Sequence, residues 1–344
     1  MLEFVGIGDV HGDKLEKILP GVGNKWICRE VRKPLNYALK KGIKHAFFYG
    51  DIGEYARWSY EFQMEFKNVL LDPKYKDLNQ WLILGNHDWD EKGRHSLEVL
   101  VNDLSLFKAH GLKLKIKVLT DLTDVEIDGV PVRFLPYPHT KTTGKALNVG
   151  HFEVAGSTRD NGRKIKDGVE TNHLCVLGHL HTCHRVGNSF YSGTLYQTNF
   201  GEYLPKSFHH VKVKDNLKHK VMNVPNDPEY KLLNVEVHSR KDLDQISDNP
   251  KVLHKLFVQD GMTIDPRDLE ERPNVVKVNR FKDDKDLKTQ LEEEWKIEDV
   301  GNVFQPEEDV ERFLSERKVE DKVKTRALKI HRRFLKKVVE NGTE

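Results

Sequence analysis

The sequence has little of what marks secreted, membrane-bound or strongly charged proteins. It contains only three cysteines among 344 residues, an odd number with no C-x-x-C pair, so neither a disulfide scaffold nor a thiolate zinc site is expected. No apolar run approaches the roughly 18 residues that a membrane-spanning helix needs, and the start of the chain lacks a basic segment followed by an apolar one. The net charge is only +2, which neither supports nor excludes a nucleic-acid partner. These absences predict a protein with reduced thiols, no membrane association and a cytoplasmic location.

What the chain has in abundance is charge of both signs and histidine. Charged residues make up 32% of it and the mean hydropathy is -0.63, as expected for a protein with an ion-rich surface. There are 17 histidines, and imidazole is the commonest neutral nitrogen ligand for transition metals. The length is sufficient for two domains, or for one large domain with an appendage.

Short apolar runs alternate with helical patterns through the first half, which predicts a layered α/β fold. The expected strands are residues 4–8, 46–49, 81–84, 131–135, 174–177 and 190–192. Helix faces are expected within 31–39, 62–70 and 97–104, where apolar residues recur at helical spacing. Asp128-Gly129 between two apolar runs is typical of a tight hairpin, so part of the sheet should be antiparallel.

The pattern changes after about residue 215. Residues 225–228, with the sequence PNDP, predict a turn or linker. Strands near 232–237 and 275–278 and a helix near 242–246 then predict a small α/β module.

From Phe281 onward the chain is rich in charge and has helical spacing, which predicts a helical tail. Its last helix, Lys322 to Lys337, is basic and amphipathic, a pattern that fits a solvated surface helix, a partner-binding helix or a contact to a DNA backbone. The expected parts are residues 1–215, a small capping domain at 228–280 and the helical segment 281–344.

Four segments place potential metal ligands directly after an apolar strand. They are Gly8-Asp9-Val10-His11, Gly50-Asp51-Ile52-Gly53-Glu54, Gly85-Asn86-His87-Asp88 and Gly178-His179-Leu180-His181. The glycine before each ligand removes a side chain where several loops must crowd together. Each segment alone could be a turn, a helix cap or a strand with exposed imidazoles. Four in this order favour one shared site, suited to two cations about 3.5–4 Å apart.

These motifs, D-x-H, G-D-x-x-E, G-N-H-D and G-H-x-H, resemble the signature of calcineurin-like metallophosphoesterases. The resemblance implies a four-layer sandwich of two mixed β-sheets flanked by helices, and a site for two divalent ions, most commonly manganese. The ligands that it implies are Asp9, His11 and His181 for one ion, Asn86 and His179 for the other, and Asp51 as the bridge.

The second ion still lacks an imidazole, which the family supplies from a strand end between the third and fourth motifs. His151 fits best, because the apolar run 147–149 leads into Gly-His. His139, after a proline-bounded hairpin, and His173, in a polar loop entry, are the competing candidates.

The remaining motif residues are not expected to bind metal. By the same resemblance His87 faces the substrate and stabilises or protonates the leaving oxygen, and Asp88 orients the ring. Glu54 stands where related nucleases usually have Asp or His, so it either touches the substrate or orders the loop.

Further features resemble the SbcD-type recombination nucleases and their bacteriophage counterparts. The segment 193–202, GTLYQTNFGE, is similar to a G-S/T-x-x-x-x-S-F-G-E stretch of that family, with Asn199 in place of Ser, and Gly150-His151-Phe152-Glu153 is like the Gly-His-x-Glu of phage members. The Asp-Arg-Gly of protein phosphatases is missing after the second motif, and Asp88 replaces their Glu.

This resemblance implies a metal-dependent DNA exonuclease or endonuclease subunit that serves DNA recombination, repair or replication, in the host cytoplasm if a phage encodes it. It also implies an SMC-like ATPase partner bound through the C-terminal helices, and a homodimer. The apolar faces at 58–66 and 97–107 are candidates for the dimer contact that could equally be core. The alternatives are a small-molecule phosphodiesterase or phosphatase, and an inactive scaffold, which would not need every ligand to be present.

Overall fold

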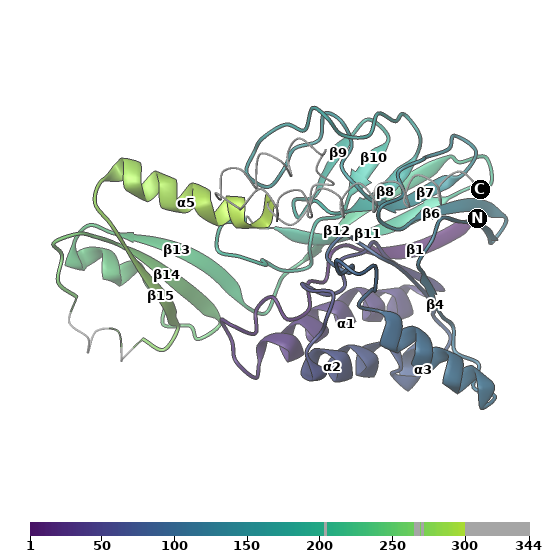
Figure 1. Cartoon of the computed structure of the whole chain (residues 1–344), viewed down its shortest axis with the longest axis horizontal. Coiled ribbons are helices and arrows are strands. Elements are labelled where there is room, and N and C mark those ends of the chain that lie inside the picture. The colour runs from purple at the N-terminus through teal and green to yellow at the C-terminus, as the bar shows by residue number, and fades with distance from the viewer. Residues whose placement is uncertain (203–204, 265–268, 270–271, 300–344) are drawn as a thin grey trace, which may run out of the picture. The chain divides into compact units, whose positions relative to one another are not determined.

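The computed structural model describes residues 1–202, 205–264, 269 and 272–299, and residues 1–298 form one compact unit. It is an α/β structure with two six-stranded mixed sheets and one three-stranded sheet, which confirms the expected α/β class (Figure 1).

The first sheet has the strand order β12-β11-β1-β2-β3-β4. Its strands are β1 (Leu2–Ile7), β2 (His45–Phe48), β3 (Asn79–Ile83), β4 (Ile116–Leu119), β11 (Lys206–Val213) and β12 (His219–Asn226). The strands β1 to β4 are parallel, while β11 and β12 are antiparallel to their neighbours. The carboxyl ends of β1, β2 and β3 therefore lie along one edge, where the first three motifs begin.

The second sheet has the order β5-β6-β7-β8-β10-β9. Its strands are β5 (Thr123–Ile127), β6 (Val130–Leu135), β7 (Leu147–His151), β8 (Cys175–Gly178), β9 (His184–Val186) and β10 (Ser189–Tyr191). The expected Asp128-Gly129 turn joins β5 and β6 as an antiparallel hairpin. Because β7 and β8 are parallel neighbours, His151 and the fourth motif emerge side by side.

The two sheets pack face to face through large apolar side chains. Phe47 and Trp81 of the first sheet contact Phe134 of the second, and the Trp81 and Phe134 rings stack with their centroids 5.4 Å apart. The other face of the first sheet is covered by α1 (Gly23–Lys41), α2 (Tyr60–Leu70) and α3 (Glu98–Ala109), with the short 3₁₀ helix η1 (Pro73–Tyr75) between α2 and β3 (Figure 1). This core holds the strand ends rigidly.

The expectation that helices flank both sheets is not met in the described part of the chain. The outer face of the second sheet is packed by an irregular segment that includes Phe152, Val154 and Ile165. No helix lies between α3 and residue 240 in the described residues. A few apolar side chains of an extended segment bury this face. Because the segment is not helical, its apolar residues do not recur every 3.6 positions.

Of the two candidate dimer faces, the one at 58–66 is largely core and the one at 97–107 is largely not. Trp58, Phe62 and Phe66 are buried and pack in one aromatic cluster beneath the first sheet. On α3 only Leu100 is buried, while Val99 remains exposed.

Two local expectations after residue 215 need correction. Pro225 and Asn226, expected in a linker, are the last residues of β12, and Asn226 bonds Glu30 in the core. The expected helix near 242–246 is a 3₁₀ helix, η2 (Arg240–Gln245), closed by a capping box of Ser239 and Asp242. The expected boundary at 215 falls in the turn between β11 and β12.

The third sheet is parallel, with the order β13-β14-β15, from β13 (Lys231–Val237), β14 (Val252–Gln259) and β15 (Val275–Phe281). The helix α5 (Asp284–Asp299) follows it, and Leu287 packs on Phe257 and Phe281. The first apolar positions of the predicted docking tail thus contact this chain. The helix expected from Lys322 to Lys337 lies outside the described residues. Within the described residues, none of the helices combines the length and apolarity required to cross a membrane.

Candidate metal centre

The five strand ends bring all the predicted metal ligands into one cluster. Asp9 and His11 follow β1, Asp51 follows β2, Asn86 follows β3, His151 ends β7, and His179 and His181 follow β8. Four of the seven ligands thus come from the first sheet and three from the second. Within it, two groups of ligand atoms can be distinguished.

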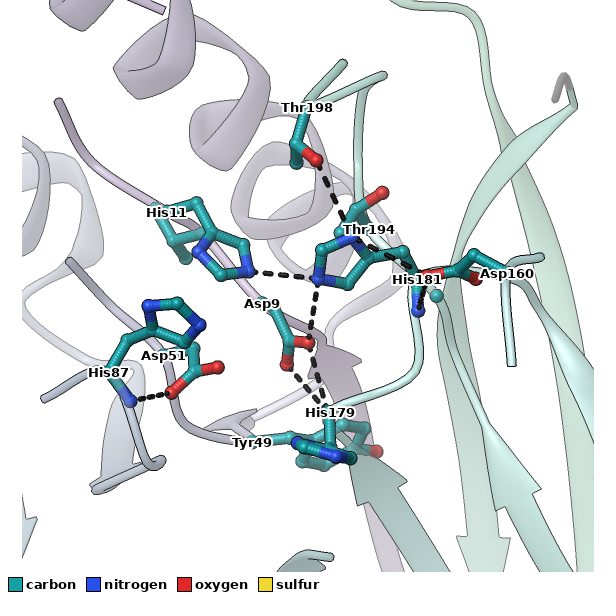
Figure 2. A network of polar contacts seen from close by, with 12 residues as sticks. Asp9, His11, Tyr49, Asp51, His87, Asp160, His179, His181, Thr194 and Thr198 are labelled. Carbon is teal, nitrogen blue, oxygen red and sulfur yellow. Dashed lines mark hydrogen bonds and ion pairs between the residues drawn. The ribbon is translucent and has the colours of Figure 1, made fainter. Parts of the chain in front are cut away.

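The first ligand group consists of Asp9, His11 and His181. The Nε2 atoms of the two imidazoles lie 2.9 Å apart, and Asp9 Oδ2 lies 3.7 Å from His181 Nε2 (Figure 2). All three side chains are buried. Figure 2 shows the two rings facing each other, with the Asp9 carboxylate beside His181.

The second ligand group consists of Asp51, Asn86, His151 and His179. His151 Nε2 lies 3.1 Å from Asp51 Oδ2 and 2.9 Å from Asn86 Oδ1. His179 Nδ1 lies 3.0 Å from the same Asn86 oxygen. Four donor atoms of the types that divalent cations accept therefore converge.

The two competing histidines lie elsewhere. His139 pairs with Asp121 at 2.7 Å, and His173 lies 3.0 Å from the Thr142 hydroxyl. Of the three candidates, only His151 belongs to the described ligand groups.

The donor chemistry of the first group fits a cation. Glu202 and Glu54 lie within 2.9 Å of the Nδ1 atoms of His181 and His11, and an ionised carboxylate only accepts hydrogen bonds. With the proton of each neutral ring on Nδ1, both Nε2 atoms present a lone pair to the space between them. Two nitrogens about 3 Å apart are the spacing expected of neighbouring ligands about 2.1 Å from one ion.

The glycines that precede the ligands are required by close approach. A Cβ added to Gly85 would lie 2.1 Å from Asp51 Oδ1, and one added to Gly178 would lie 2.5 Å from Asp9 Oδ1. Such contacts are too short for any side chain, so the crowding expected from the sequence is confirmed at both positions.

The backbone is strained at three of the ligands. His11, Asp51 and His179 have φ values of 46°, 46° and 84°, a left-handed region that non-glycine residues seldom adopt. Strain of this kind concentrates at functional sites, where the surrounding structure enforces it.

Attraction between a carboxylate and a histidine ring shifts the pKa values in the second group. Burial alone would raise the pKa of Asp51, but His151 and His87 outweigh it and hold the pKa well below its usual value. Burial alone would lower the pKa of His151, but Asp51 and Asp9 raise it to about 9. The cluster therefore contains an ionised carboxylate next to a basic ring.

His87 lies beside both groups without belonging to either in the described pairs. Its backbone N–H donates to Asp51 Oδ1 at 2.9 Å, and its ring stands edge-on to His11 with centroids 5.0 Å apart. Burial lowers the pKa of His87, with Asp51 acting in the opposite direction. Its Nδ1 lies 3.0 Å from the Glu54 carbonyl oxygen, which fixes the ring from behind.

Asp88 does not orient the His87 ring as expected. Its carboxylate accepts hydrogen bonds from the backbone N–H groups of Ile52, Gly53 and Gly85 and from the Ser96 hydroxyl. Burial, followed by the nearby Asp51, raises the pKa of Asp88 to about 6. Asp88 ties the second motif loop to the third.

Glu54 faces the cluster from the loop after β2. Its Oε2 lies 2.9 Å from His11 Nδ1 and its Oε1 accepts from Lys14 at 2.8 Å. Burial would raise the pKa of Glu54, but His11 and Lys14 lower it to about 2. These contacts make Glu54 a support of the ligand His11, which is neither of the two roles considered from the sequence, substrate contact and loop ordering.

Sequence reasoning assigned no role to Glu202, Lys206 or the Tyr49 carbonyl. Glu202 Oε1 accepts from His181 Nδ1 at 2.8 Å, and Lys206 bonds the other carboxylate oxygen. His151 Nδ1 donates to the Tyr49 carbonyl at 2.7 Å. The F-G-E stretch contained a signal for Glu202, whereas a backbone carbonyl leaves no trace in residue identity.

No protein-family model and no curated protein matches this chain. The donor set is suited to divalent cations that accept mixed nitrogen and oxygen ligands. Residues that could hold a metal ion are therefore present in the two groups described, and a third group, His11, Glu54 and His87, overlaps the first at His11.

Proposed function

We propose that this chain is a two-metal metallophosphoesterase of the SbcD type, a DNA nuclease subunit that hydrolyses phosphodiester bonds. The observation that carries the proposal is the adjacency of the two ligand groups, with Asp51 in one and Asp9 in the other and His151 within 3.7 Å of both carboxylates. A single-ion or structural site would not need two such groups. The proposed fold is the family's sandwich, with the second sheet covered by an irregular segment.

The chain's own residues would share the work as follows. Asp9, His11 and His181 would hold one ion, and Asn86, His151 and His179 the other, with Asp51 between them. Two divalent ions, most commonly manganese in the resembling family, polarise a phosphate and lower the pKa of water. His87, whose ring stands beside His11 and whose N–H is held by Asp51, would donate a proton to the leaving sugar oxygen.

The preference for DNA over phosphoproteins rests on sequence features rather than on the ligand groups. The Asp-Arg-Gly of protein phosphatases is absent, and Asp88 is committed to tying loops together. The SMC-like ATPase partner and the homodimer rest on the resemblance alone.

The test uses the full chain with linear duplex DNA, single-stranded DNA, bis-p-nitrophenyl phosphate and a phosphoserine peptide. Each is incubated with manganese, with magnesium or with a chelator. We expect metal-dependent cleavage of DNA and of the diester, abolished by Asp51→Asn and retained by Asp124→Asn, whose carboxylate pairs with Arg133 at the surface. Phosphate release from the peptide without DNA cleavage would favour the phosphatase alternative. No hydrolysis of any substrate in the presence of bound metal would favour the scaffold.

A further inference from the structure

A buried lysine–glutamate pair stands behind His181. Glu202 Oε1 accepts from His181 Nδ1 at 2.8 Å, Thr198 bonds the same oxygen, and Lys206 bonds Oε2. Lys206 also donates to the Thr194 hydroxyl at 2.9 Å. Glu202 and Lys206 are only 5% and 3% exposed, so neither charge is screened by water.

A second pair of the same kind stands behind His11. Glu54 Oε2 lies 2.9 Å from His11 Nδ1, and Lys14 donates to Oε1 at 2.8 Å. Glu54 is 8% exposed. The two pairs come from different loops, yet each presents one carboxylate oxygen to an Nδ1 atom and the other oxygen to a lysine.

The second ligand group is supported differently. His151 Nδ1 donates to a neutral backbone carbonyl, that of Tyr49. His179 Nε2 lies 3.5 Å from Glu153, whose carboxylate is bonded by Arg159 and is partly exposed. At the nitrogen that faces away from Asn86, neither ring has a buried carboxylate at hydrogen-bonding distance in the described contacts.

These contacts decide which nitrogen of each ring is available to a ligand. A neutral imidazole can carry its proton on either nitrogen, and a partner at one nitrogen fixes the choice and the ring's orientation. A buried carboxylate does so firmly when a lysine compensates its charge. Outer partners of this kind typically change metal affinity by about 10- to 100-fold.

We propose that Lys14–Glu54 and Lys206–Glu202 are matched positioning pairs that hold the Nε2 atoms of His11 and His181 in the first ligand group, which therefore binds its divalent ion more tightly than the second. The inference rests on the proposed metal site and adds the order in which the two ligand groups bind their ions. The carboxylates of the two pairs act through the histidine rings.

The test is a manganese titration of the metal-free full chain. Binding is measured by calorimetry and by electron paramagnetic resonance of the free ion. The variants are Glu54→Gln, Glu202→Gln and the double variant Glu202→Gln/Lys206→Met, which avoids leaving a buried lysine without its carboxylate. Glu30→Gln is the matched control, since Glu30 is a buried carboxylate paired with Lys33 that contacts none of the ligands. Glu153→Gln probes the second group.

We expect two binding steps in the wild type. Glu54→Gln and each Glu202 variant should weaken the tighter step by about 10- to 100-fold and change the weaker step by less than about threefold. Glu30→Gln should change neither, and Glu153→Gln should affect only the weaker step. Nitrogen-15 NMR of the metal-free protein should find the His11 and His181 protons on Nδ1, with that preference lost in the Gln variants.

Equal weakening of both steps, or an unchanged tighter step, overturns the inference while leaving the nuclease proposal intact if the variants still cleave DNA. A wild type that binds no divalent ion overturns both. Because Glu54 is the less buried of the two carboxylates, Glu54→Gln remains informative if the Glu202 variants do not fold.

Discussion

His11 Nε2 and His181 Nε2 lie 2.9 Å apart although the residues are 170 positions apart in the sequence. One follows β1 in the first sheet and the other follows β8 in the second. Both rings are buried, and the Nδ1 atom of each lies within 2.9 Å of a carboxylate oxygen. Two ring nitrogens at this spacing suit neighbouring ligands of one cation, which makes the centre testable by metal binding as well as by hydrolysis.

Asp51→Asn should remove hydrolysis and weaken metal binding at both ligand groups. The Asp51 carboxylate contacts His151 and receives the His87 N–H, and a neutral amide there lowers the negative charge offered to both ions. We expect each binding step to weaken by about tenfold or more, as measured by calorimetry. Full metal occupancy with unchanged hydrolysis would contradict the bridging assignment.

His87→Gln should separate chemistry from metal binding. His87 is outside both ligand groups, so the variant should keep near-normal manganese content while turnover falls by about a hundredfold. Bis-p-nitrophenyl phosphate should be affected less than DNA, because p-nitrophenolate leaves without a proton. A parallel loss of metal and turnover would make His87 a ligand.

Asp88→Ala should destabilise the fold even without metal. The substitution leaves the buried N–H groups of Ile52, Gly53 and Gly85 without their acceptor, at a cost of about 3 kcal/mol or more in the free energy of unfolding. Urea denaturation of the metal-free protein measures it. Asp124→Ala, which removes a surface ion pair with Arg133, is the control and should change stability by less than about 1 kcal/mol. Similar urea midpoints for the two variants would show that Asp88 does not stabilise the fold by tying the second motif loop to the third.

His209→Leu should flatten the dependence of stability on pH. Burial lowers the pKa of His209 to about 3, below the value of about 6.5 in the unfolded chain. The unfolded state then binds the extra proton, so the wild type loses about 1.4 kcal/mol per pH unit as the pH falls from 6.5 toward 3. Between pH 6.5 and 5 the loss should be about 2 kcal/mol smaller in the variant. Identical slopes in urea titrations would show that His209 is not the group responsible.

Two truncations should separate α5 from the rest of the tail. Ending the chain after residue 280 removes Phe281 and Leu287, which pack on Phe257, so the third sheet should lose cooperative unfolding. Ending it after residue 299 keeps this contact and all the ligands, so manganese-dependent diester hydrolysis should persist. The chain that ends after residue 299 should still lose association with an ATPase partner. If it unfolds or loses hydrolysis, residues 300–344 are part of the phosphoesterase fold.

The sequence predicted the strand ends well because each motif follows a short run of buried apolar residues. The strands at β1, β2, β3, β6, β8 and β10 agree with their predicted positions within two residues. β11 was missed because its sequence KSFHHVKV buries histidine and lysine, so polarity does not alternate as on a half-exposed strand. The roles of His209 and Lys206 could be assigned only when their burial and partners were known.

The ligand identities followed from the motifs, whereas their supports did not. The apolar run before it favoured His151 over His139 and His173, but its place beside His179 depends on β7 and β8 being parallel neighbours. The resemblance assigned Asp88 to the His87 ring, whereas its carboxylate accepts from Ile52 and Gly53. Side-chain direction of this kind depends on tertiary packing that no local pattern encodes.

The left-handed backbone conformation of His11, Asp51 and His179 lowers the stability of the fold at residues that the proposed activity needs. Each such residue costs on the order of 1–3 kcal/mol, which the rest of the structure must offset. An asparagine at position 51 would lose the ion pair with His151 at 3.1 Å, so substituting Asp51 would not recover this cost in the metal-free protein. At His11 and His179, selection for thermal stability alone would favour residues that relieve the strain, at the expense of the ligands.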